Sequence, residues 1–404
     1  MSDVDGGEKE VRGRWGLHPS LVIVMTIFID ITGFGMVIPL LPFYAETFQA
    51  GSLALGVLVA SFAIMQFIFS PILGRISDNV GRKPVLLLSI LISMLSFVIF
   101  AVANSFLVLL LSRIIAGMAT ETSVAQAYTA DLTEEEDRTK GMGRVAAANG
   151  MGFIIGPAIG GFLSVYGFSV PGFAAAGLTF LNFLFVLVFL PESARRSQDS
   201  EVRKPERRKY LPNLTRGFST KEVGMGFLVF FLVILAFSTV PVIVPLLGIS
   251  YFDLGTTDMS YIFVYIGLVQ VVLQGFLMER IAKKFGEGRL MRAGPLVMAS
   301  GILVMPLIPN FLVFLTANAM MATGVGIMRT VVPSFISKRT GVGEQGGALG
   351  MTQSVSSIAR VPGPLVGGVF AEFGGLPAPF FLSTALLAVA FIVSWKACQI
   401  CTPA

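Results

Sequence analysis

The stretch Gly156-Pro157-Ala158-Ile159-Gly160-Gly161 lies inside an apolar run, and a similar stretch returns as Gly363-Pro364-Leu365-Val366-Gly367-Gly368, an offset of 207 from position 156 to position 363. A proline within a helix removes a backbone hydrogen bond, and glycines let a neighbouring helix approach closely. Such a helix is destabilised in water, whereas in a bilayer neighbouring helices can satisfy the freed backbone groups. Two copies half a chain apart therefore predict a duplicated membrane bundle with a close helix contact at each copy.

The composition also indicates a membrane protein. The 404 residues are 54% hydrophobic and only 13% charged, with a mean hydropathy of +0.80, whereas soluble domains contain about 25% charged residues. Long apolar runs between short charged clusters are typical of transmembrane helices of about 20 residues, and the alternating segments of about 10 residues that mark an outer-membrane barrel are missing. We therefore predict an all-α membrane protein embedded in a lipid bilayer.

Twelve spans are predicted, in two pseudo-symmetric six-helix bundles. The spans cover residues 19–44, 54–76, 84–103, 106–131, 140–166, 171–191, 222–249, 257–281, 291–309, 311–336, 347–372 and 377–398. The predicted domains are a tail at 1–18, a first bundle at 19–192, a polar basic linker at 193–221 and a second bundle at 222–404. Pro39-Leu40-Leu41 and Pro245-Leu246-Leu247, at an offset of 206, support an internal repeat, which is the architecture of transporters whose halves move around a central site.

The distribution of positive charge predicts the orientation. The loops after the odd-numbered spans contain no Lys or Arg, so by the positive-inside rule both termini are expected in the cytoplasm, with the chain in the plasma membrane. The net charge of +5 does not indicate a nucleic-acid partner, because the basic residues lie in loops between spans. The single histidine, His18, excludes a histidine-based metal site or a serine-histidine triad, and the terminal pair Cys398 and Cys401 is interpreted as incidental. No enzyme, metal or cofactor is predicted.

The loop after the second span reads Gly74-Arg75-Ile76-Ser77-Asp78-Asn79-Val80-Gly81-Arg82-Lys83. It resembles the signature loop of the major facilitator superfamily, G-x-L-x-D-x-x-G-R-K, with Ile76 in the leucine position. Physically it is a tight turn in which Gly81 permits the backbone conformation and Asp78 can accept hydrogen bonds from Arg82. The residues expected to hold one conformation closed are Gly74, Asp78, Gly81, Arg82, Asp131, Gly156 and Pro157.

Other motifs narrow the resemblance to the drug:proton antiporter branch. The fourth span carries Arg113-Ile114-Ile115-Ala116-Gly117 and ends Tyr128-Thr129-Ala130-Asp131 before an acidic run, and the fifth span's Gly156-Pro157 resembles the antiporter motif. Asp30, followed by Gly33, Gly35, Pro39 and Pro42, resembles the first-span pattern of tetracycline-efflux-like members. The resemblance covers essentially the whole chain and implies a monomeric twelve-span exporter driven by protons.

Ionisable residues inside the spans are the functional candidates, because a charge in lipid costs a few kcal/mol or more. In the first half they are Asp30, Arg113 and Glu121. At a rise of about 1.5 Å per residue, Asp30 and Glu121 lie about 18 Å and about 15 Å from the cytoplasmic ends of their spans. We therefore expect these three residues to meet near the midplane and couple transport to protons, with Asp30 as the first choice of carrier and Glu121 as the alternative. A fixed structural pair of Asp30 with Arg113 is the simpler interpretation.

The second half carries Arg329 and Arg360, without an acidic partner in their own spans. If these two arginines shared one cavity with the three ionisable residues of the first half, the cavity would contain three positive and two negative charges. Such a cavity is compatible with anionic, zwitterionic or metal-chelated substrates. In the alternative interpretation, one arginine caps carbonyl groups freed by Pro333 or Pro362, or snorkels inward. The candidate cavity residues are Phe34, Gln126, Asn149, Gln270, Arg329, Gln353 and Arg360.

The favoured function is proton-coupled efflux of a small amphipathic compound by alternating access. No G-x-x-x-x-G-K-[ST] stretch occurs in the sequence, so ATP is not expected to drive it. A proton-coupled symporter for a sugar or organic anion is a second hypothesis, against which the Gly156-Pro157 motif argues. A non-transporting sensor or scaffold is a third, disfavoured by the signature loop and the buried carboxylates.

Overall fold

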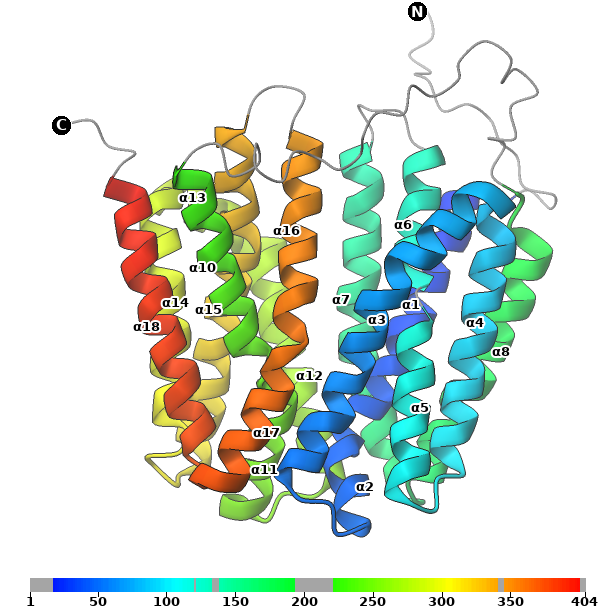
Figure 1. Ribbon diagram of the computed structural model, residues 1–404, viewed down its shortest axis with the longest axis horizontal. Coiled ribbons are helices and arrows are strands. Elements are labelled where there is room, and N and C mark those ends of the chain that lie inside the picture. The colour runs from blue at the N-terminus through cyan, green and yellow to red at the C-terminus, as the bar shows by residue number, and fades with distance from the viewer. Residues whose placement is uncertain (1–16, 120, 133–137, 193–220, 341–344, 400–404) are drawn as a thin grey trace, which may run out of the picture. The chain divides into compact units, whose positions relative to one another are not determined.

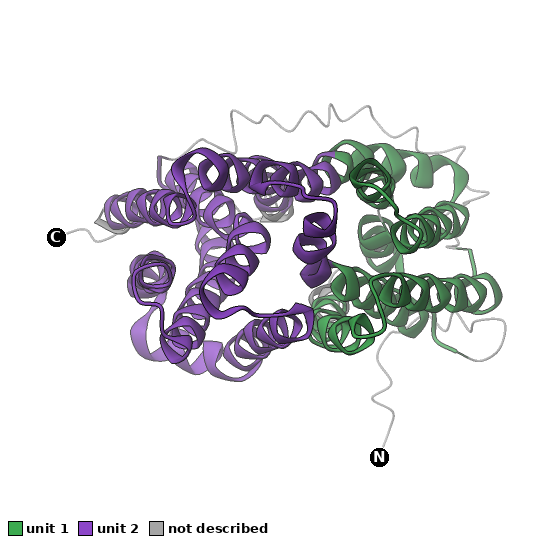
Figure 2. Cartoon of the chain, turned by 90° about the horizontal axis from the view of Figure 1, so that it is seen from below, with its two compact units in different colours: residues 1–37, 65–202 green, residues 38–64, 203–404 purple. Residues whose placement is uncertain are grey.

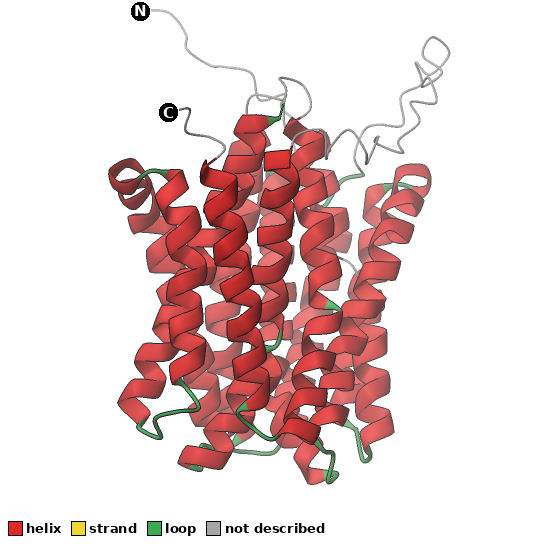
Figure 3. Ribbon diagram, turned by 60° about the vertical axis from the view of Figure 1, so that its left-hand side comes forward, coloured by secondary structure: helices red, strands yellow, loops and turns green. Residues whose placement is uncertain are grey.

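The structure, a computed structural model, describes residues 17–119, 121–132, 138–192, 221–340 and 345–399. Most of the predicted tail and linker, residues 133–137 with the acidic run 134–137, and Cys401 lie outside these ranges. Across the described residues the chain folds into helices joined by short loops, and none of these residues forms a strand (Figure 3). The predicted all-helical fold is confirmed.

The helices coincide with the twelve predicted spans (Figure 1). The first half contains α1 (Pro19–Val37), η1 (Ile38–Leu40), α2 (Leu41–Thr47), α3 (Ser52–Val80), α4 (Arg82–Ala101), α5 (Phe106–Met118), α6 (Glu121–Leu132), α7 (Arg138–Ser164) and α8 (Ser169–Phe189). The second half contains α10 (Lys221–Ser238), α11 (Val240–Phe252), α12 (Thr256–Val272), η2 (Leu273–Leu277), α13 (Met278–Phe285), α14 (Glu287–Val304), α15 (Phe311–Arg339), α16 (Gln345–Arg360), α17 (Pro362–Gly374) and α18 (Ala378–Gln399).

Ten helical stretches of the described chain are by themselves long and apolar enough to cross a membrane. The remaining two predicted spans are α14 and the pair α16–α17. Three spans are broken next to a proline: α1 gives way to η1 at Pro39, α10 to α11 before Pro241, and α16 to α17 at Pro362. Each proline lacks the N–H that would continue the helical hydrogen bonding, so the interruptions follow from the sequence.

The chain divides into two compact units (Figure 2). Unit 1 comprises residues 1–37 and 65–202, and unit 2 comprises residues 38–64 and 203–404. Residues 38–64, which include α2 and the start of α3, therefore pack with the second half of the sequence. The predicted domain boundary at 193–221 falls almost wholly outside the described residues and stays a prediction.

Unit 1 has a core of aliphatic side chains contributed by several of its helices. Pairs such as Ile23 and Ile27, or Leu86 and Ile90, are fully buried at a spacing of four residues, which places each pair on one helix face. Tyr128 joins this core from α6 and donates its hydroxyl to the carbonyl of Pro191 at 2.8 Å. The core fixes α1, α4 and α6, the three helices that carry the candidate proton site.

The first glycine-proline stretch forms a close contact between α7 and α1. A Cβ atom on Gly156 would lie 2.5 Å from the carbonyl oxygen of Thr32 and 2.8 Å from Cα of Gly35. One on Gly160 would meet the backbone of Met36, 2.7 Å from its Cα atom. These neighbours are backbone atoms that cannot rotate away. The close helix contact predicted for the first copy is confirmed.

The second copy makes close contacts on two sides within unit 2. A Cβ atom on Gly363 would collide with Ser238 of α10. On the other side, Gly368 would place one 2.6 Å from the carbonyl oxygen of Ser52 and 3.0 Å from Cα of Gly56. The second copy thus joins α17 both to its partner within the repeat and to the start of α3, and the close contact predicted there is also confirmed.

Candidate functional site

The carboxyl groups of Asp30 and Glu121 lie close enough for their charges to repel each other. Asp30 is half-buried in α1. Glu121 is only 3% exposed, and its Oε1 atom has no hydrogen-bond partner, while Ser93 of α4 donates a hydrogen bond to its carboxylate. The structure therefore brings together the two carboxyl groups that were predicted to share one site.

Glu121 owes its position to a break in the fourth span. The sequence predicts one continuous span over 106–131, but α5 ends at Met118, Ala119 has an extended backbone with φ −77° and ψ 123°, and α6 begins at Glu121. A carboxylate in the first turn of a helix lies next to backbone N–H groups without partners, and these stabilise negative charge. The break gives a buried acid a polar backbone environment.

Arg113 does not join these carboxyl groups. Its side chain is 1% exposed, its guanidinium carbon lies 5.5 Å from the centre of the Phe100 ring, and its Nε donates to Ser112 at 3.4 Å. Its Nη2 has no hydrogen-bond partner, and within the described ranges no ion pair links it to Asp30 or Glu121. The expected meeting of all three groups is therefore not what the structure shows.

The signature loop forms a charged cluster around Arg82, the first residue of α4. Its Nη1 lies 2.6 Å from Asp78 Oδ1, and its Nε lies 3.0 Å from Asp131 Oδ2 near the end of α6. Nη1 also donates to the Ser77 hydroxyl at 2.6 Å. Three of the predicted gating residues, Asp78, Arg82 and Asp131, thus meet in one cluster that connects α3, α4 and α6.

Glu192 adds a further connection that sequence reasoning missed. Its Oε1 accepts the backbone N–H of Arg82 at 2.8 Å, which attaches the end of α8 to the start of α4. Gly81 has a φ of +115°, where a side chain is strained, and a Cβ atom there would lie 2.8 Å from Glu192. No local sequence pattern predicts this contact, because its partners are more than 100 positions apart.

Arg329 and Arg360 lie near each other in unit 2, close enough for their charges to repel. The guanidinium carbon of Arg329 is 5.0 Å from the centre of the Phe237 ring of α10. Arg360, the last residue of α16, is exposed. Phe237, like Phe34, is one of the aromatic residues that the sequence suggests for an adaptable apolar pocket, and that assignment stays a prediction.

A family model described as Major Facilitator Superfamily matches residues 23–294 and, as a second match, residues 226–397. Together the matches cover nearly the whole chain. The chain belongs to the major facilitator superfamily. It is accordingly a multi-pass membrane protein and a transporter of small molecules. The first match runs from the first half into the second, and the second match lies within the second half.

Curated relatives within the superfamily are named for drug resistance. The chain is 29% identical over 386 residues to "Multidrug resistance protein 1" of Bacillus subtilis (strain 168), covering 94% of this chain and 96% of the relative. It is 33% identical over 351 residues to "Tetracycline resistance protein, class E" of Escherichia coli, covering 86% of each. These relatives agree with the predicted branch.

Solved superfamily structures share the fold. The human organic anion transporter MFSD10 (TETRAN) is 24% identical, with a TM-score of 0.67, covering 93% of this chain and 98% of that one. A bacterial homolog of the human lysosomal transporter Spinster, in an inward-facing unoccupied conformation, is 14% identical with a TM-score of 0.73, covering 94% and 96%. At these identities the likeness concerns the fold alone.

The uncharged candidates of this superfamily member occupy varied environments. Phe34 packs edge-on against Phe153, with ring centres 6.1 Å apart, and the Asn149 amide donates to the Val145 carbonyl of its own helix at 2.9 Å. Gln126 and Gln270 are half-buried and Gln353 is exposed. Their assignment to a substrate cavity stays a prediction.

Unit 2 of this superfamily member repeats the signature-loop cluster with the charges exchanged. Glu287 begins α14 as Arg82 begins α4, and Lys338 lies near the end of α15 as Asp131 lies near the end of α6, at offsets of 205 and 207. Lys338 Nζ lies 2.8 Å from Glu287 Oε1, which also accepts the Ser334 hydroxyl at 2.7 Å. Glu287 therefore replaces the basic Arg82 of unit 1, and Lys338 replaces the acidic Asp131.

Replacing Glu287 with glutamine is expected to lower Tm slightly at pH 7, and the effect should diminish as the pH falls below the ordinary glutamate pKa of 4.5. Burial raises the pKa of the Glu287 carboxyl, but hydrogen bonds from Lys338 and Ser334 outweigh burial, so its pKa lies below the ordinary 4.5. The pair therefore stabilises the fold above the unfolded pKa, and this contribution is lost as the pH falls through the folded pKa. Because Lys338 is 64% exposed, the loss at pH 7 should stay below about 1 kcal/mol.

Thermal unfolding of the purified protein between pH 3 and pH 7 measures this difference. Glu279→Gln is the matched control, since Glu279 also contacts a lysine, Lys283, at 2.6 Å, but both side chains are more than three-quarters exposed. It should change Tm little at any pH. A Glu287→Gln deficit of the same size at pH 3 and pH 7 would contradict the assigned charge contribution.

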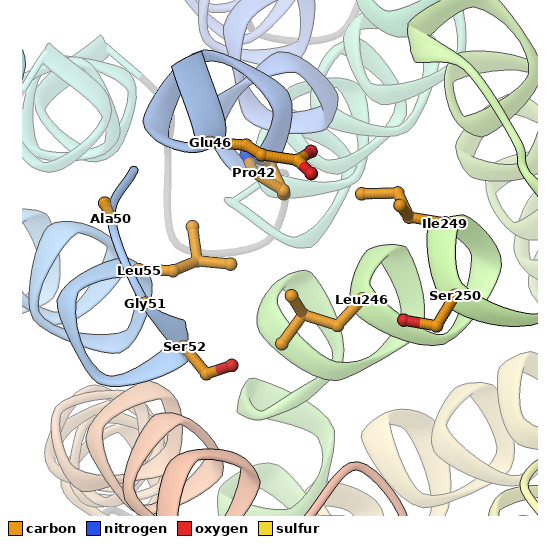
Figure 4. A pocket seen from close by; sticks show the side chains of 9 residues that line it. All are labelled: Pro42, Glu46, Ala50, Gly51, Ser52, Leu55, Leu246, Ile249 and Ser250. Atoms are coloured by element: carbon orange, nitrogen blue, oxygen red, sulfur yellow. The ribbon is translucent and has the colours of Figure 1, made fainter. Parts of the chain in front are cut away.

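A small pocket of about 180 Å³ lies in unit 2, between the α2–α3 region and α11 (Figure 4). Its lining consists of Pro42, Glu46, Ala50, Gly51, Ser52, Leu55, Leu246, Ile249 and Ser250. Sites for drug-sized ligands usually have about 300–1,000 Å³, and none of the predicted cavity residues lines this pocket. We therefore do not assign substrate binding to it.

Proposed function

We propose that this superfamily member exports small amphipathic compounds, multidrug- or tetracycline-like, in exchange for protons by alternating access. The observation that carries the proposal is the buried pair of Asp30 and Glu121, which lacks a cationic partner in the described residues. Like charges repel strongly in a low-dielectric environment, so the pair is expected to hold at least one proton. The resistance proteins among the relatives support a drug as the other substrate.

The proton cycle follows from the position of the pair. With a proton bound, the two carboxyl groups no longer repel each other, and the site carries less charge through the membrane. When the proton leaves, the charge returns, and the conformation that gives the carboxylates water becomes favoured. Asp30, which is half-buried, is the better placed of the two to exchange protons with water, whereas Glu121 is closed off by Ser93 and α6.

Both termini are proposed to lie in the cytoplasm, since the loops rich in Lys and Arg are those after the even-numbered spans. The Arg82 cluster would then lie at the cytoplasmic end of unit 1 and hold α3, α4 and α6 together in one conformation. The predicted gating role of the remaining residues, Gly74, Gly81, Gly156 and Pro157, belongs to the same proposal, as do a monomeric state and a location in the plasma membrane.

Transport in membrane vesicles of the two orientations tests the direction. We expect everted vesicles acidified inside to accumulate ethidium or tetracycline, and nigericin, which collapses the pH gradient, to abolish the accumulation. Accumulation only in right-side-out vesicles acidified outside would favour the proton symporter. Purified protein in liposomes that moved neither compound and no protons would favour a sensor or scaffold.

A further inference from the structure

The second half of the chain places two guanidinium groups in the middle of its membrane spans. At about 1.5 Å per residue, Arg329 lies about 15 Å from the end of α15 at Arg339, and Arg360 lies about 22 Å from the start of α16. Helices α10, α15 and α16 pack against one another within unit 2, and Phe237 of α10 lies under Arg329. The two charges therefore share one region near the membrane midplane.

This region has no counter-charge of its own. Within the described residues the guanidinium group of neither Arg329 nor Arg360 takes part in a hydrogen bond or an ion pair. The described acidic residues of unit 2 lie near helix ends or in loops. Several are already engaged: Glu222 with Arg339, Glu279 with Lys283, Glu287 with Lys338, and Glu372 with the backbone N–H of Leu53. The Phe237 ring holds Arg329 by a cation–π contact but does not neutralise it.

A capping role at Pro362 does not account for Arg360. The carbonyl that Pro362 would leave without a partner belongs to Ile358, and it accepts the backbone N–H of Val361 at 3.3 Å. Arg360 is therefore not needed as its cap. Two cations that repel each other within a membrane-spanning bundle are a cost to the fold. An external anion would remove that cost.

The surroundings of Arg360 indicate water rather than lipid. Gln353, Ser357 and Arg360 follow one another at spacings of four and three residues along α16, which places them on one helix face. Gln353 and Arg360 are exposed and Ser357 is half-buried. Charged residues within membrane spans nearly always face a water-filled cavity or the bundle interior, so this polar face is suited to a soluble ligand.

We propose that Arg329 and Arg360 form the subsite for an anionic group, a carboxylate or sulfonate, on an amphipathic substrate. This inference rests on the proposed export function, whose substrate class it specifies. Guanidinium groups bind a planar carboxylate through two parallel hydrogen bonds, and Phe237 with its apolar neighbours suits the ring system that carries the acid. The exported compounds then include organic anions or zwitterions, which bind here through their acidic group.

Two dyes with the same ring system but opposite charge test the proposal. Fluorescence polarisation measures the binding of anionic fluorescein and of cationic rhodamine 123 to purified protein in neutral detergent, without any gradient. We expect Arg360→Gln and Arg329→Gln each to weaken fluorescein binding at least tenfold and to leave rhodamine 123 binding unchanged or stronger. Arg329→Lys, which keeps the charge but loses the planar fork, should fall between wild type and Arg329→Gln.

Arg292→Gln is the matched control, because the Arg292 guanidinium also lies 5.0 Å from an aromatic ring, that of Trp395, but near the start of α14. It should change fluorescein binding less than twofold. The Tm of ligand-free Arg360→Gln should equal or exceed that of wild type, since one of two repelling charges is removed. Wild-type protein that does not bind fluorescein, equal losses for both dyes, or a Tm several degrees lower would each overturn the proposal.

A lipid headgroup offers similar chemistry through its phosphate. The depth of both arginines, near the middle of a hydrocarbon core of about 30 Å, argues against it. Fluorescein binding in phosphatidylcholine nanodiscs with and without phosphatidylglycerol distinguishes a site for a soluble anion from a site for an anionic lipid headgroup. Loss of fluorescein binding when phosphatidylglycerol is present would overturn the proposal. The binding measurements need no proton gradient, so they are independent of the transport assay. If fluorescein did not bind but ethidium was still exported, only the anion subsite would be wrong. If fluorescein bound but ethidium was not exported, the proposed function would be wrong.

Discussion

Replacing Asp30 with asparagine is expected to reduce proton-driven transport at least about a hundredfold, the scale of losing a proton-transfer group. Asparagine has nearly the same shape as aspartic acid but cannot take up or release a proton. It also removes one charge from the repelling pair with Glu121, so the fold should be at least as stable as wild type. Binding of ethidium without a gradient should stay within a fewfold of wild type.

The measurement is ethidium accumulation in everted vesicles together with the associated proton movement. Glu46→Gln is the matched control, because Glu46 is an exposed carboxylate in α2 and should not affect coupling. Unchanged antiport in Asp30→Asn would remove Asp30 from the mechanism. If Glu121→Gln alone abolished coupling, Glu121 would be the carrier, and Asp30 would serve as the group that repels it.

Replacing Gly160 with alanine is expected to destabilise unit 1 by about 1–3 kcal/mol or more, the scale of overpacking a rigid contact. The added methyl group would meet the backbone of Met36 in α1, and backbone atoms cannot move aside as a flexible side chain can. The helices α1 and α7 would have to separate, which would also displace Asp30 from Glu121. We expect a clear fall in Tm, less protein in the membrane, and weaker coupling in what remains.

Gly177→Ala is the control, since a Cβ atom on Gly177 in α8 has no neighbour within 4 Å. This substitution should be neutral or stabilise the protein by up to about 1 kcal/mol, because alanine restricts the unfolded chain and favours helix. Thermal unfolding in detergent and the amount of protein in the membrane compare the two variants. Equal Tm values for Gly160→Ala and Gly177→Ala would contradict the close contact.

The fold followed from the sequence because membrane spans are encoded locally. A run of about 20 apolar residues must become a helix in lipid, so all twelve spans could be located, including α14 and the broken pair α16–α17. Breaks next to proline, as at Pro362, were also visible in the sequence. The break at Ala119 was not, since neither a glycine nor a proline stands at that position.

The candidate site could be predicted only in part. The number of residues between each carboxylate and the cytoplasmic end of its span predicts similar membrane depths for Asp30 and Glu121. The structure brings these two residues together. The same count of residues failed for Arg113, because depth says nothing about direction around the helix axis. Residues eight positions apart on one continuous helix face directions about 80° apart, and here Arg113 and Glu121 lie on two separate helices, α5 and α6. Contacts such as Arg329 with Phe237 needed the tertiary packing.

The exchanged charges of the two clusters have a consequence for folding fidelity. A chain with two similar halves can place a helix of one half in the other, and the α4–α6 and α14–α15 pairs are natural candidates for such a swap. In the native pairs, Arg82 contacts Asp131 and Lys338 contacts Glu287. Swapped pairs would bring Arg82 to Lys338 and Glu287 to Asp131, two repulsions in place of two attractions. Divergence of the repeat has thus given these two helix pairs opposite charge patterns, which favour pairing within each half over a swap between the halves.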